Sequence, residues 1–417
     1  MKALRLVGGA LVLASCFGFG FSWRDLQNGS LPSTRSVGSL FGAQAPKSNV
    51  SATQVFRTAY ARIQSDYYQK VDPTKLKYAG INGLMGALGD PHTIFMEPKQ
   101  AKEFALETSA NFVGVGARLQ PDPLGAKVVV VFDDGPAGRA GLRVGDTVTG
   151  VDNESMVGKT VEDVVSRIRG EEGTSVKLQL VRPGVDKPVL LTIRRAKVIA
   201  PTVESSMIEG TKVGYITVAM FSEPTSDQFD KALNKIDAHK PEGLVIDVRN
   251  NPGGLLETAV EMLSRFAEDK VVVKMRMRDG REEVAKTYMG QKRTFRYPVV
   301  VLMNEESASA AEIFGGALRD YKLTTLVGEH SYGKASVQNV YALIDGSSAK
   351  ITIARYFLPG GSDIGRRVDA DGQYISGGLL PDVKAKVNED APFLYGDPKG
   401  DAQLAKALEV IRTKNGK

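Results

Sequence analysis

The sequence has 417 residues, more than one ordinary hydrophobic core organises, so we expect two or three domains. Its 54 lysines and arginines nearly balance its 48 aspartates and glutamates, and without a long basic run this composition does not favour nucleic-acid binding. The single cysteine, Cys16, lies near the N-terminus, which excludes disulfides and thiol catalysis in the rest of the chain.

The first 23 residues are predicted to direct export. Lys2 and Arg5 precede an uncharged apolar stretch over residues 6–23, which is typical of a secretory signal peptide or an uncleaved membrane anchor. The letters LASC, ending at Cys16, are also similar to a bacterial lipoprotein cleavage box, but the apolar run continues beyond them, which disfavours lipidation. We therefore expect a periplasmic or cell-envelope protein that meets the membrane only through this segment.

Residues 24–50 are rich in Ser, Gly and Pro and are expected to form a flexible linker. Residues 51–110 are expected to be helical. Ser51 is a candidate N-cap of a first helix, and a second helix is predicted over about residues 74–88, before the letters LGDPH. The first helix has one apolar face, formed by Val55, Phe56, Tyr60, Ile63 and Tyr67.

From Asn111 the sequence changes to short β-rich runs separated by glycine turns, so a β-rich domain is expected over residues 111–198. A helix is predicted at residues 160–168, with Val161, Val164, Val165 and Ile168 on one face. Further strands are predicted at residues 212–221, 244–249 and 297–303, and further helices at 225–239, 255–266, 310–320 and 401–412.

Ser309 lies where the buried strand at residues 297–303 passes through a short polar turn into the predicted helix at residues 310–320. A serine at such a corner can project its hydroxyl into a cleft. The N–H of Ala310 then lies at a helix N-terminus, where unpaired amides favour developing negative charge. Ser309 is therefore the candidate nucleophile, and Ala310 is a candidate donor to an oxyanion.

Lys334 is the candidate base for Ser309. A lysine serves as a base only when its pKa is depressed, and Lys334 lies in a segment poor in acidic residues. Gln338 follows four residues later, on the same side of a helical turn or of a strand, and is expected to orient the lysine amine. None of the three histidines has the neighbours of a triad histidine; they are His92, His239 and His330.

The strand at residues 244–249 is followed by Asn250, Asn251, Pro252, Gly253 and Gly254. A Gly-Gly turn lets the backbone approach a substrate closely, so the amides of Gly253 and Gly254 are candidates for a second oxyanion donor. An ordinary loop is the alternative interpretation.

Together these motifs resemble those of the carboxyl-terminal processing peptidases, or tail-specific proteases. In that family SAS-A-x-E carries the serine, G-K-x-x-V-Q carries the lysine and glutamine, D-x-R-x-N-P-G-G carries the glycine turn, and LGDPH precedes the PDZ domain. His92 is therefore expected to be structural. Residues 358–364 read LPGGSDI where relatives commonly have T-P-x-G-R-S-I, which puts local substrate contacts in doubt.

The resemblance covers about residues 51–385 and implies an α/β multidomain fold. It comprises the helical N-terminal region, an inserted PDZ domain and a crotonase-like ββα spiral protease core over residues 199–385, with residues 386–417 as a tail and helix. In PDZ domains a glycine-containing loop binds a peptide's terminal carboxylate, while the peptide adds a strand to the sheet edge. The resemblance assigns this loop to Phe112, Val113, Gly114, Val115 and Gly116, although a plain tight turn is the alternative.

The implied function is that of an exported serine endopeptidase that binds free, apolar protein C-termini and cleaves by acyl transfer. Glu312 is expected to support the first helical turn, and Asp320 to be structural. No metal or other cofactor is expected, because the sequence has neither a Walker motif nor a His or Cys cluster. The alternatives are a catalytically inactive PDZ-type peptide-binding protein and, more distantly, an acyl-CoA enzyme. Participation of a homo-oligomer or an adaptor protein is left open.

Overall fold

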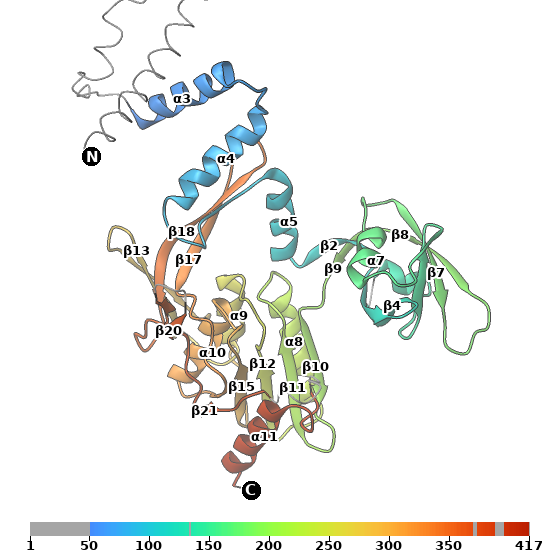
Figure 1. Cartoon of the computed structure of the whole chain (residues 1–417). Coiled ribbons are helices and arrows are strands. Elements are labelled where there is room, and N and C mark those ends of the chain that lie inside the picture. The colour runs from blue at the N-terminus through green and yellow to red at the C-terminus, as the bar shows by residue number, and fades with distance from the viewer. Residues whose placement is uncertain (1–50, 133–134, 370–372, 388–395, 417) are drawn as a thin grey trace, which may run out of the picture. The chain divides into compact units, whose positions relative to one another are not determined.

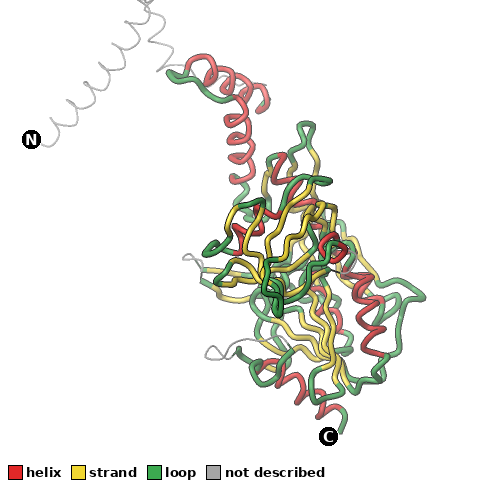
Figure 2. Tube along the Cα trace, turned by 90° about the vertical axis from the view of Figure 1, so that its right-hand side faces the viewer, coloured by secondary structure: helices red, strands yellow, loops and turns green. Residues whose placement is uncertain are grey.

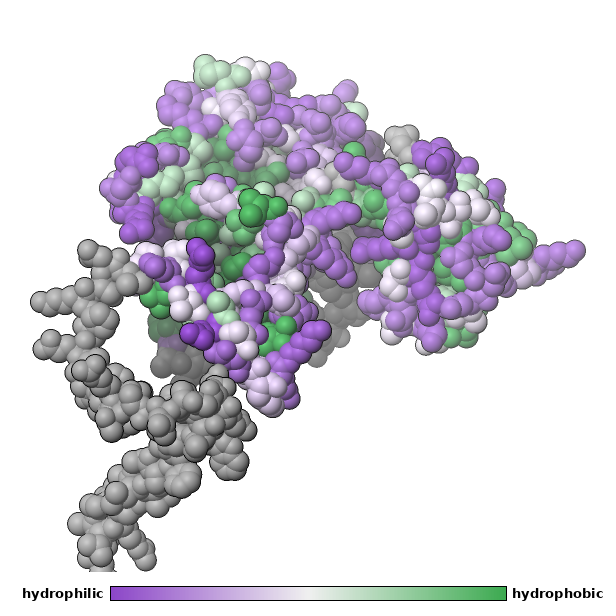
Figure 3. Space-filling model, turned by 90° about the horizontal axis from the view of Figure 1, so that it is seen from above, coloured by the Kyte–Doolittle hydropathy of each residue, from purple (hydrophilic) through white to green (hydrophobic). Residues whose placement is uncertain are grey.

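The computed structural model describes residues 51–416 except 133–134, 370–372 and 388–395 (Figure 1). The predicted export segment and linker therefore lie outside the described residues. The chain divides into one unit that ends at Ala79 and a second that begins at Gly80. Within the described part, every helix is too short or too polar to span a bilayer. The face seen in Figure 3 is mainly hydrophilic, with smaller hydrophobic patches.

The first unit contains helix α3 (Ala52–Asp66) and the start of helix α4 (Pro73–Gly86). Ser51 caps α3, because its hydroxyl accepts a hydrogen bond from the Gln54 N–H at 3.2 Å. Both predicted helices are confirmed, although α4 ends two residues before the predicted boundary. Most of the apolar face of α3 is exposed, including Val55, Phe56, Ile63 and Tyr67.

A β-rich domain follows, built on a six-stranded antiparallel sheet. Its strands are β3 (Ala117–Asp122), β4 (Gly125–Val131), β5 (Thr147–Val151), β6 (Glu154–Ser155), β7 (Ser175–Val181) and β8 (Val189–Arg194). The short helix α6 (Pro136–Arg139) and helix α7 (Val161–Ile168) belong to the same domain. Strand β2 (Asn111–Gly114) pairs with β9 (Ala196–Ile199), which joins the entry and the exit of the domain.

Helix α7 confirms the helix predicted at residues 160–168. Thr160 is its N-cap and forms a capping box with Asp163, so the helix begins where the hydrogen-bonding side chains require it. Val164 and Ile168 of this helix are buried in the domain core. In β7 the buried and exposed residues alternate, as expected for a strand with one face on a core.

The part of the chain that follows the β-rich domain contains a second six-stranded sheet, with the strand order β10-β11-β12-β15-β16-β21. Its strands are β10 (Val203–Met207), β11 (Val213–Val218), β12 (Gly243–Asp247), β15 (Val299–Met303), β16 (Thr325–Gly328) and β21 (Val383–Lys384). All neighbours are parallel except β10 and β11. Figure 2 shows strands of this region running side by side with helices packed along them.

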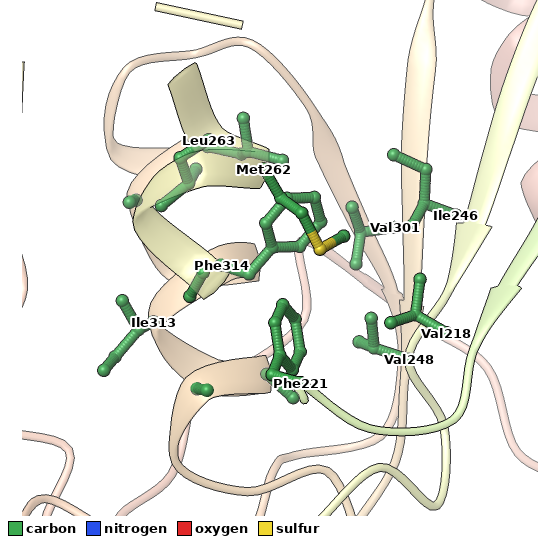
Figure 4. Packing of buried hydrophobic residues seen from close by; sticks show 14 of the residues in the cluster. Val218, Phe221, Ile246, Val248, Met262, Leu263, Val301, Ile313 and Phe314 are labelled. Carbon is green, nitrogen blue, oxygen red and sulfur yellow. The ribbon is translucent and has the colours of Figure 1, made fainter. Parts of the chain in front are cut away.

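Both faces of this sheet are covered, and accordingly every residue of β12 and of β15 is buried. Helices α8 (Thr225–Asp237), α9 (Leu256–Ser264) and α10 (Ala310–Asp320) supply buried residues to the cluster on one face, and α11 (Ala402–Lys414) supplies those on the other. Figure 4 shows Phe221 and Phe314 directed toward Val248 and Val301. The predicted helices are confirmed, with boundaries that differ by up to two residues.

A separate five-stranded antiparallel sheet carries the segment of Lys334. It consists of β1 (Ile94–Met96), β13 (Val271–Met277), β14 (Glu282–Lys286), β17 (Ser336–Ala342) and β18 (Ser348–Phe357). Strand β18 is the longest and pairs with β17, β1 and β13. The remaining elements are helix α5 (Pro98–Thr108) and the strand pair β19 (Arg367–Val368) and β20 (Tyr374–Ser376).

Candidate active site

Ser309 lies at the turn between β15 and α10 with a backbone conformation of φ 54° and ψ −115°. This is outside the regions that residues with a side chain ordinarily occupy, and such strain costs about 1–3 kcal/mol unless the surroundings impose it. The surroundings include Ser307, whose buried hydroxyl donates to the Val248 carbonyl at 2.7 Å, and Ala308, whose N–H donates to the Asn251 carbonyl at 2.9 Å. The corner that carries Ser309 is thus fastened to the end of β12.

Glu312, in the first turn of α10, is completely buried and accepts four hydrogen bonds. Its Oε2 accepts from the N–H of Ser309 at 2.7 Å and from the N–H of Lys334 at 2.9 Å. Its Oε1 accepts from the N–H of Gly333 at 2.7 Å and from the Ser331 hydroxyl at 2.5 Å. Glu312 therefore does more than support the helical turn as predicted, since it joins the two segments that carry Ser309 and Lys334.

No cation pairs with Glu312 among its four partners, and its burial has a cost. Burial raises the pKa of Glu312 to about 7, although the hydrogen bonds from Ser331, Gly333, Ser309 and Lys334 act in the opposite direction. A carboxylate held only by neutral donors is thus close to protonation near neutral pH.

Lys334 is half-buried, and its pKa lies below the ordinary value for a lysine. Burial is the main cause, and the positive charge of Lys350 adds to it, while Glu312 and Asp90 act in the opposite direction. The buried Tyr356 hydroxyl donates to the carbonyl of Lys334 and lies 3.5 Å from the carbonyl oxygen of Ser309. A lysine with a depressed pKa has the chemistry that a base for a serine requires.

Gln338 lies in β17, opposite Thr352 of β18. Its amide nitrogen donates to the hydroxyls of Ser336, at 2.8 Å, and Thr352, at 3.2 Å. These partners fix the amide group beside the segment of Lys334, but no direct hydrogen bond from Gln338 to Lys334 is present among the described residues. The orienting role of Gln338 stays a prediction.

Gly253 and Gly254 lie directly against the Ser309 corner. A Cβ atom on Gly253 would be 2.7 Å from the Ser309 Cβ and 2.9 Å from the Ala310 nitrogen, and Gly253 has a φ of 96°, so only glycine fits there. The N–H of Gly253 already donates to Asn251 Oδ1 at 2.8 Å. This N–H is therefore engaged in this structure, and the role of Gly253 or Gly254 as the second oxyanion donor stays a prediction. Within the described residues the N–H groups of Ala310 and Gly254 have no hydrogen-bond acceptor.

The LGDPH turn also lies beside Lys334, which the sequence did not indicate. Asp90 accepts hydrogen bonds from the His92 N–H at 3.0 Å and from the Thr93 hydroxyl at 2.7 Å. Burial lowers the pKa of His92, and the positive charge of Lys334 lowers it further. His92 is thus held mainly as a neutral side chain close to the candidate base.

A buried ion network follows β12, before the glycine turn. The Arg249 guanidinium donates to Asp247 and, at 2.6 and 2.9 Å, to Asp401, the N-cap residue of α11. Tyr215 donates to Asp247 at 2.6 Å. Arg249 is nearly inaccessible, and although burial alone would lower its pKa, the two carboxylates hold the pKa above the ordinary value. The C-terminal helix is thereby tied to the strand that leads to Gly253 and Gly254.

Asp320, at the end of α10, accepts a hydrogen bond from the Gly360 N–H at 2.8 Å. It therefore fastens the segment at residues 358–364, where the chain departs from the family pattern, to the helix that begins at Ser309. This contact agrees with the structural role predicted for Asp320.

The predicted carboxylate loop borders an apolar cavity of about 300 Å³. Phe112, Val113 and Gly114 belong to β2, whereas Val115 and Gly116 turn into β3. The loop residues that line the cavity are Phe112, Gly114, Val115 and Gly116, and its opposite wall includes Val165 and Ile168 of α7. Val113 does not line it. Among the described residues no cluster of His, Cys, Asp and Glu could hold a metal ion.

The chain matches three family models. Peptidase family S41 matches residues 212–384, a PDZ domain matches residues 127–182, and the activating protease CtpB N-terminal domain matches residues 19–100. A solved S41 protease structure from Bacteroides fragilis has a TM-score of 0.52 at 16% identity and covers 93% of this chain and 98% of its own. The fold is therefore that of a multidomain S41 peptidase, which confirms the predicted fold class.

Curated relatives agree with this class. The chain is 36% identical over 330 residues to the carboxy-terminal processing protease CtpB of Bacillus subtilis, covering 78% of this chain and 68% of the relative. It is 35% identical over 361 residues to CtpA of the same organism, covering 86% and 74%. The chain belongs to peptidase family S41, and it is a serine protease of the carboxy-terminal processing type with a PDZ domain. The inactive peptide-binding alternative is not favoured.

Proposed function

We propose that the protein is an exported endopeptidase in which Ser309 is the nucleophile and Lys334 is the general base. The observation that carries this proposal is the shared contact of both residues with Glu312 Oε2. Because that oxygen accepts from Ser309 N–H at 2.7 Å and from Lys334 N–H at 2.9 Å, the two nitrogens are no more than 5.6 Å apart. A depressed pKa of Lys334 supports the role of base.

The proposed reaction is acyl transfer in two steps. Neutral Lys334 accepts the proton of the Ser309 hydroxyl as its oxygen attacks the peptide carbonyl, and the resulting ammonium protonates the leaving amine. Neutral Lys334 then takes a proton from a water that attacks the acyl-enzyme carbonyl; the ester bond to Ser309 breaks, Lys334 returns the proton to the Ser309 oxygen, and the new C-terminal carboxylic acid is released. The N–H groups of Ala310 and Gly254 are free to stabilise the oxyanion in both steps, and Gln338 is proposed to orient the lysine.

We further propose that the PDZ domain binds the free C-terminus of the substrate at Phe112–Gly116. The cavity beside this loop has apolar walls, including Phe132, Leu142 and Leu178, which suits an apolar terminal side chain. Capture raises the local concentration of the chain to be cut. Residues 1–23 would direct export to the periplasm or cell envelope, either as a cleaved signal or as an anchor.

Two substitutions test the dyad in the full chain. Ser309→Ala and Lys334→Ala should each reduce cleavage of an unfolded substrate by about a thousandfold or more, because both belong to one catalytic unit. Lys274→Ala is the matched control, since Lys274 is a half-buried lysine in β13. Initial rates and thermal unfolding midpoints are measured together. Activity in either dyad variant comparable with the wild type, at an unchanged unfolding midpoint, would refute the proposal.

Terminal amidation of the substrate tests the proposed PDZ capture. Hydrogen bonds to a charged carboxylate contribute about 1.5–3 kcal/mol, so amidation should weaken capture by roughly ten- to a hundredfold and slow cleavage accordingly. The measurement compares initial rates for free-acid and amidated versions of one peptide. Equal rates would contradict tail recognition, and a wild-type protein that binds the free tail without cutting it would revive the peptide-binding alternative.

A further inference from the structure

Strand β18 carries a second half-buried lysine, Lys350, near the candidate base. Lys350 lies opposite Ile94 of β1 and Val340 of β17, and Thr352, two residues further along, lies opposite Gln338. Residues two apart on a strand project from the same face. Lys350 therefore shares the face on which the Thr352 hydroxyl accepts a hydrogen bond from the Gln338 amide at 3.2 Å.

The LGDPH turn is fastened to the same part of β18. The N–H of Thr352 donates to the Thr93 hydroxyl at 3.0 Å, and that hydroxyl donates to Asp90 at 2.7 Å. The carboxylate of Asp90 acts on both Lys334 and Lys350 and favours the protonated form of each. We call Asp90, His92, Lys334 and Lys350 the charge cluster.

The charge cluster holds two amines and one carboxylate, so a second ammonium there has no full counter-charge. His92 adds no further positive charge at neutral pH, because burial and Lys334 lower its pKa. Glu312 of α10 faces Lys334 as well, but burial raises its pKa to about 7, which weakens it as a counter-charge. One lysine of the pair is therefore favoured as the ammonium and the other as the free amine.

The contacts of the two lysines decide which is the ammonium. The Lys350 Nζ lies 5.3 Å from the ring centroid of Phe104 in α5, where the face of an aromatic ring attracts a cation. Burial lowers the pKa of Lys350 below the ordinary value for a lysine, and the carboxylate of Asp90 acts in the opposite direction, toward the protonated form. Lys334 has no aromatic ring beneath its amine among the described residues, and both burial and Lys350 disfavour its ammonium.

We propose that Lys350 is a positioning residue of the active site, whose ammonium over Phe104 and beside Asp90 keeps Lys334 in the neutral form that can act as a base. This inference rests on the proposed role of Lys334. A neighbouring cation is one established way to activate a lysine for catalysis. Lys350 does not touch the substrate; it acts only through its charge.

Removing that charge should raise the pKa of Lys334, since one of the causes that lower it disappears. Lys334 would then lose its proton only at higher pH. For Lys350→Met we expect the acid limb of the kcat/KM profile to move up by about 0.5–1 pH unit, which is roughly three- to tenfold lower activity on that limb. The plateau at high pH should be unchanged, because Lys334 is neutral there in both proteins.

The test measures kcat/KM of the full chain from pH 5 to 10 on a peptide with a free apolar C-terminus. Lys350→Arg keeps the charge and should leave the pH midpoint of the acid limb unchanged. Lys274→Met removes a distant charge and should also leave this pH midpoint unchanged. Lys274 lies opposite Phe357, seven residues along β18 from Lys350, or about 23 Å. If Lys350→Met unfolds, as judged by its melting curve, Lys350→Gln replaces it as the neutral variant.

The possible results separate this inference from the dyad itself. If Lys334→Ala is inactive and the neutral variant has the wild-type midpoint or a lower one, the inference is overturned while the dyad stands. If Lys334→Ala retains activity, the dyad fails and the inference fails with it. An upward shift in the neutral variant that Lys350→Arg does not show supports the proposed role of the charge. The same shift in Lys350→Arg would mean that packing rather than charge is responsible, which overturns the inference.

Discussion

Two buried polar networks hold the residues around Ser309, one centred on Glu312 and the other on Arg249. Glu312 is a single carboxylate that accepts four hydrogen bonds, and none of the four donors carries a charge. Arg249 is a cation enclosed by the carboxylates of Asp247 and Asp401. The first network links residues 309–334 across the candidate dyad, and the second links the glycine turn to the C-terminal helix.

This difference in charge pairing determines which of the two networks responds to pH. Burial of an anion without a cation raises its pKa, as at Glu312, to about 7. At Arg249 the neighbouring carboxylates instead hold the pKa of a buried cation above its ordinary value, although burial alone would lower it. We therefore expect the Arg249 network to supply constant rigidity, and the Glu312 network to change near neutral pH.

The largest effect is expected from Arg249→Met. This change leaves Asp247 and Asp401 buried without their cation, and breaking a buried ion pair in this way destabilises a protein by about 3–5 kcal/mol. Urea unfolding at pH 7 measures the loss. The control is Arg281→Met, which removes an exposed arginine paired with Asp279 and should leave the unfolding curve unchanged. Equal curves for the two variants would show that the network does not stabilise the fold.

A smaller loss of stability, with a large loss of activity, is expected from Glu312→Gln. The amide places an NH₂ group where one carboxylate oxygen accepts two hydrogen bonds, so buried donors at Gly333, Ser331, Ser309 or Lys334 lose their acceptor. We expect a cost of about 1–3 kcal/mol and roughly a hundredfold lower kcat/KM. Denaturant unfolding and initial rates are measured on the same protein. Unchanged rates would contradict the joining role of Glu312.

The smallest effect concerns how the stability of the wild type depends on pH. The folded-state pKa of Glu312 is raised above its ordinary value, so its contribution favours the folded state below about pH 4.5 and is lost as pH rises toward 7. Glu312→Gln lacks this titration. The stability advantage of the wild type over Glu312→Gln should therefore shrink between pH 5 and 7. An advantage that grows over this interval would reverse the assigned direction of the pKa shift.

Much of the core was predictable because its signals are local. The apolar run before Ser309 and the helix signals after it placed α10 at Ala310–Asp320 as predicted, and β15 differs only by two residues at its start. The residue types at Ser309, Lys334 and the glycine turn also followed from short motifs. These segments form their elements through burial and capping within a few neighbouring residues.

What the sequence did not reveal depends on distant partners. The carboxylate of Glu312 meets Gly333 and Lys334, which are 21 and 22 residues away, and Arg249 meets Asp401 across 152 residues. No periodicity encodes such pairs. The hydrogen bond from the Gly253 N–H to the Asn251 side chain was likewise not evident from the Gly-Gly motif. Lys350 lacked any motif and became visible only through the register of β18.

The most direct measurement of the central claim is covalent labelling of the full chain with a fluorophosphonate, which reacts with activated serine hydroxyls. Mass spectrometry of the digested protein then locates the phosphonylated residue. The account predicts modification of Ser309 alone among the serines, at a rate that rises with pH and falls by at least about a hundredfold in Lys334→Ala. Labelling of another serine, or an equal labelling rate of Ser309 in the wild type and in Lys334→Ala, would contradict it.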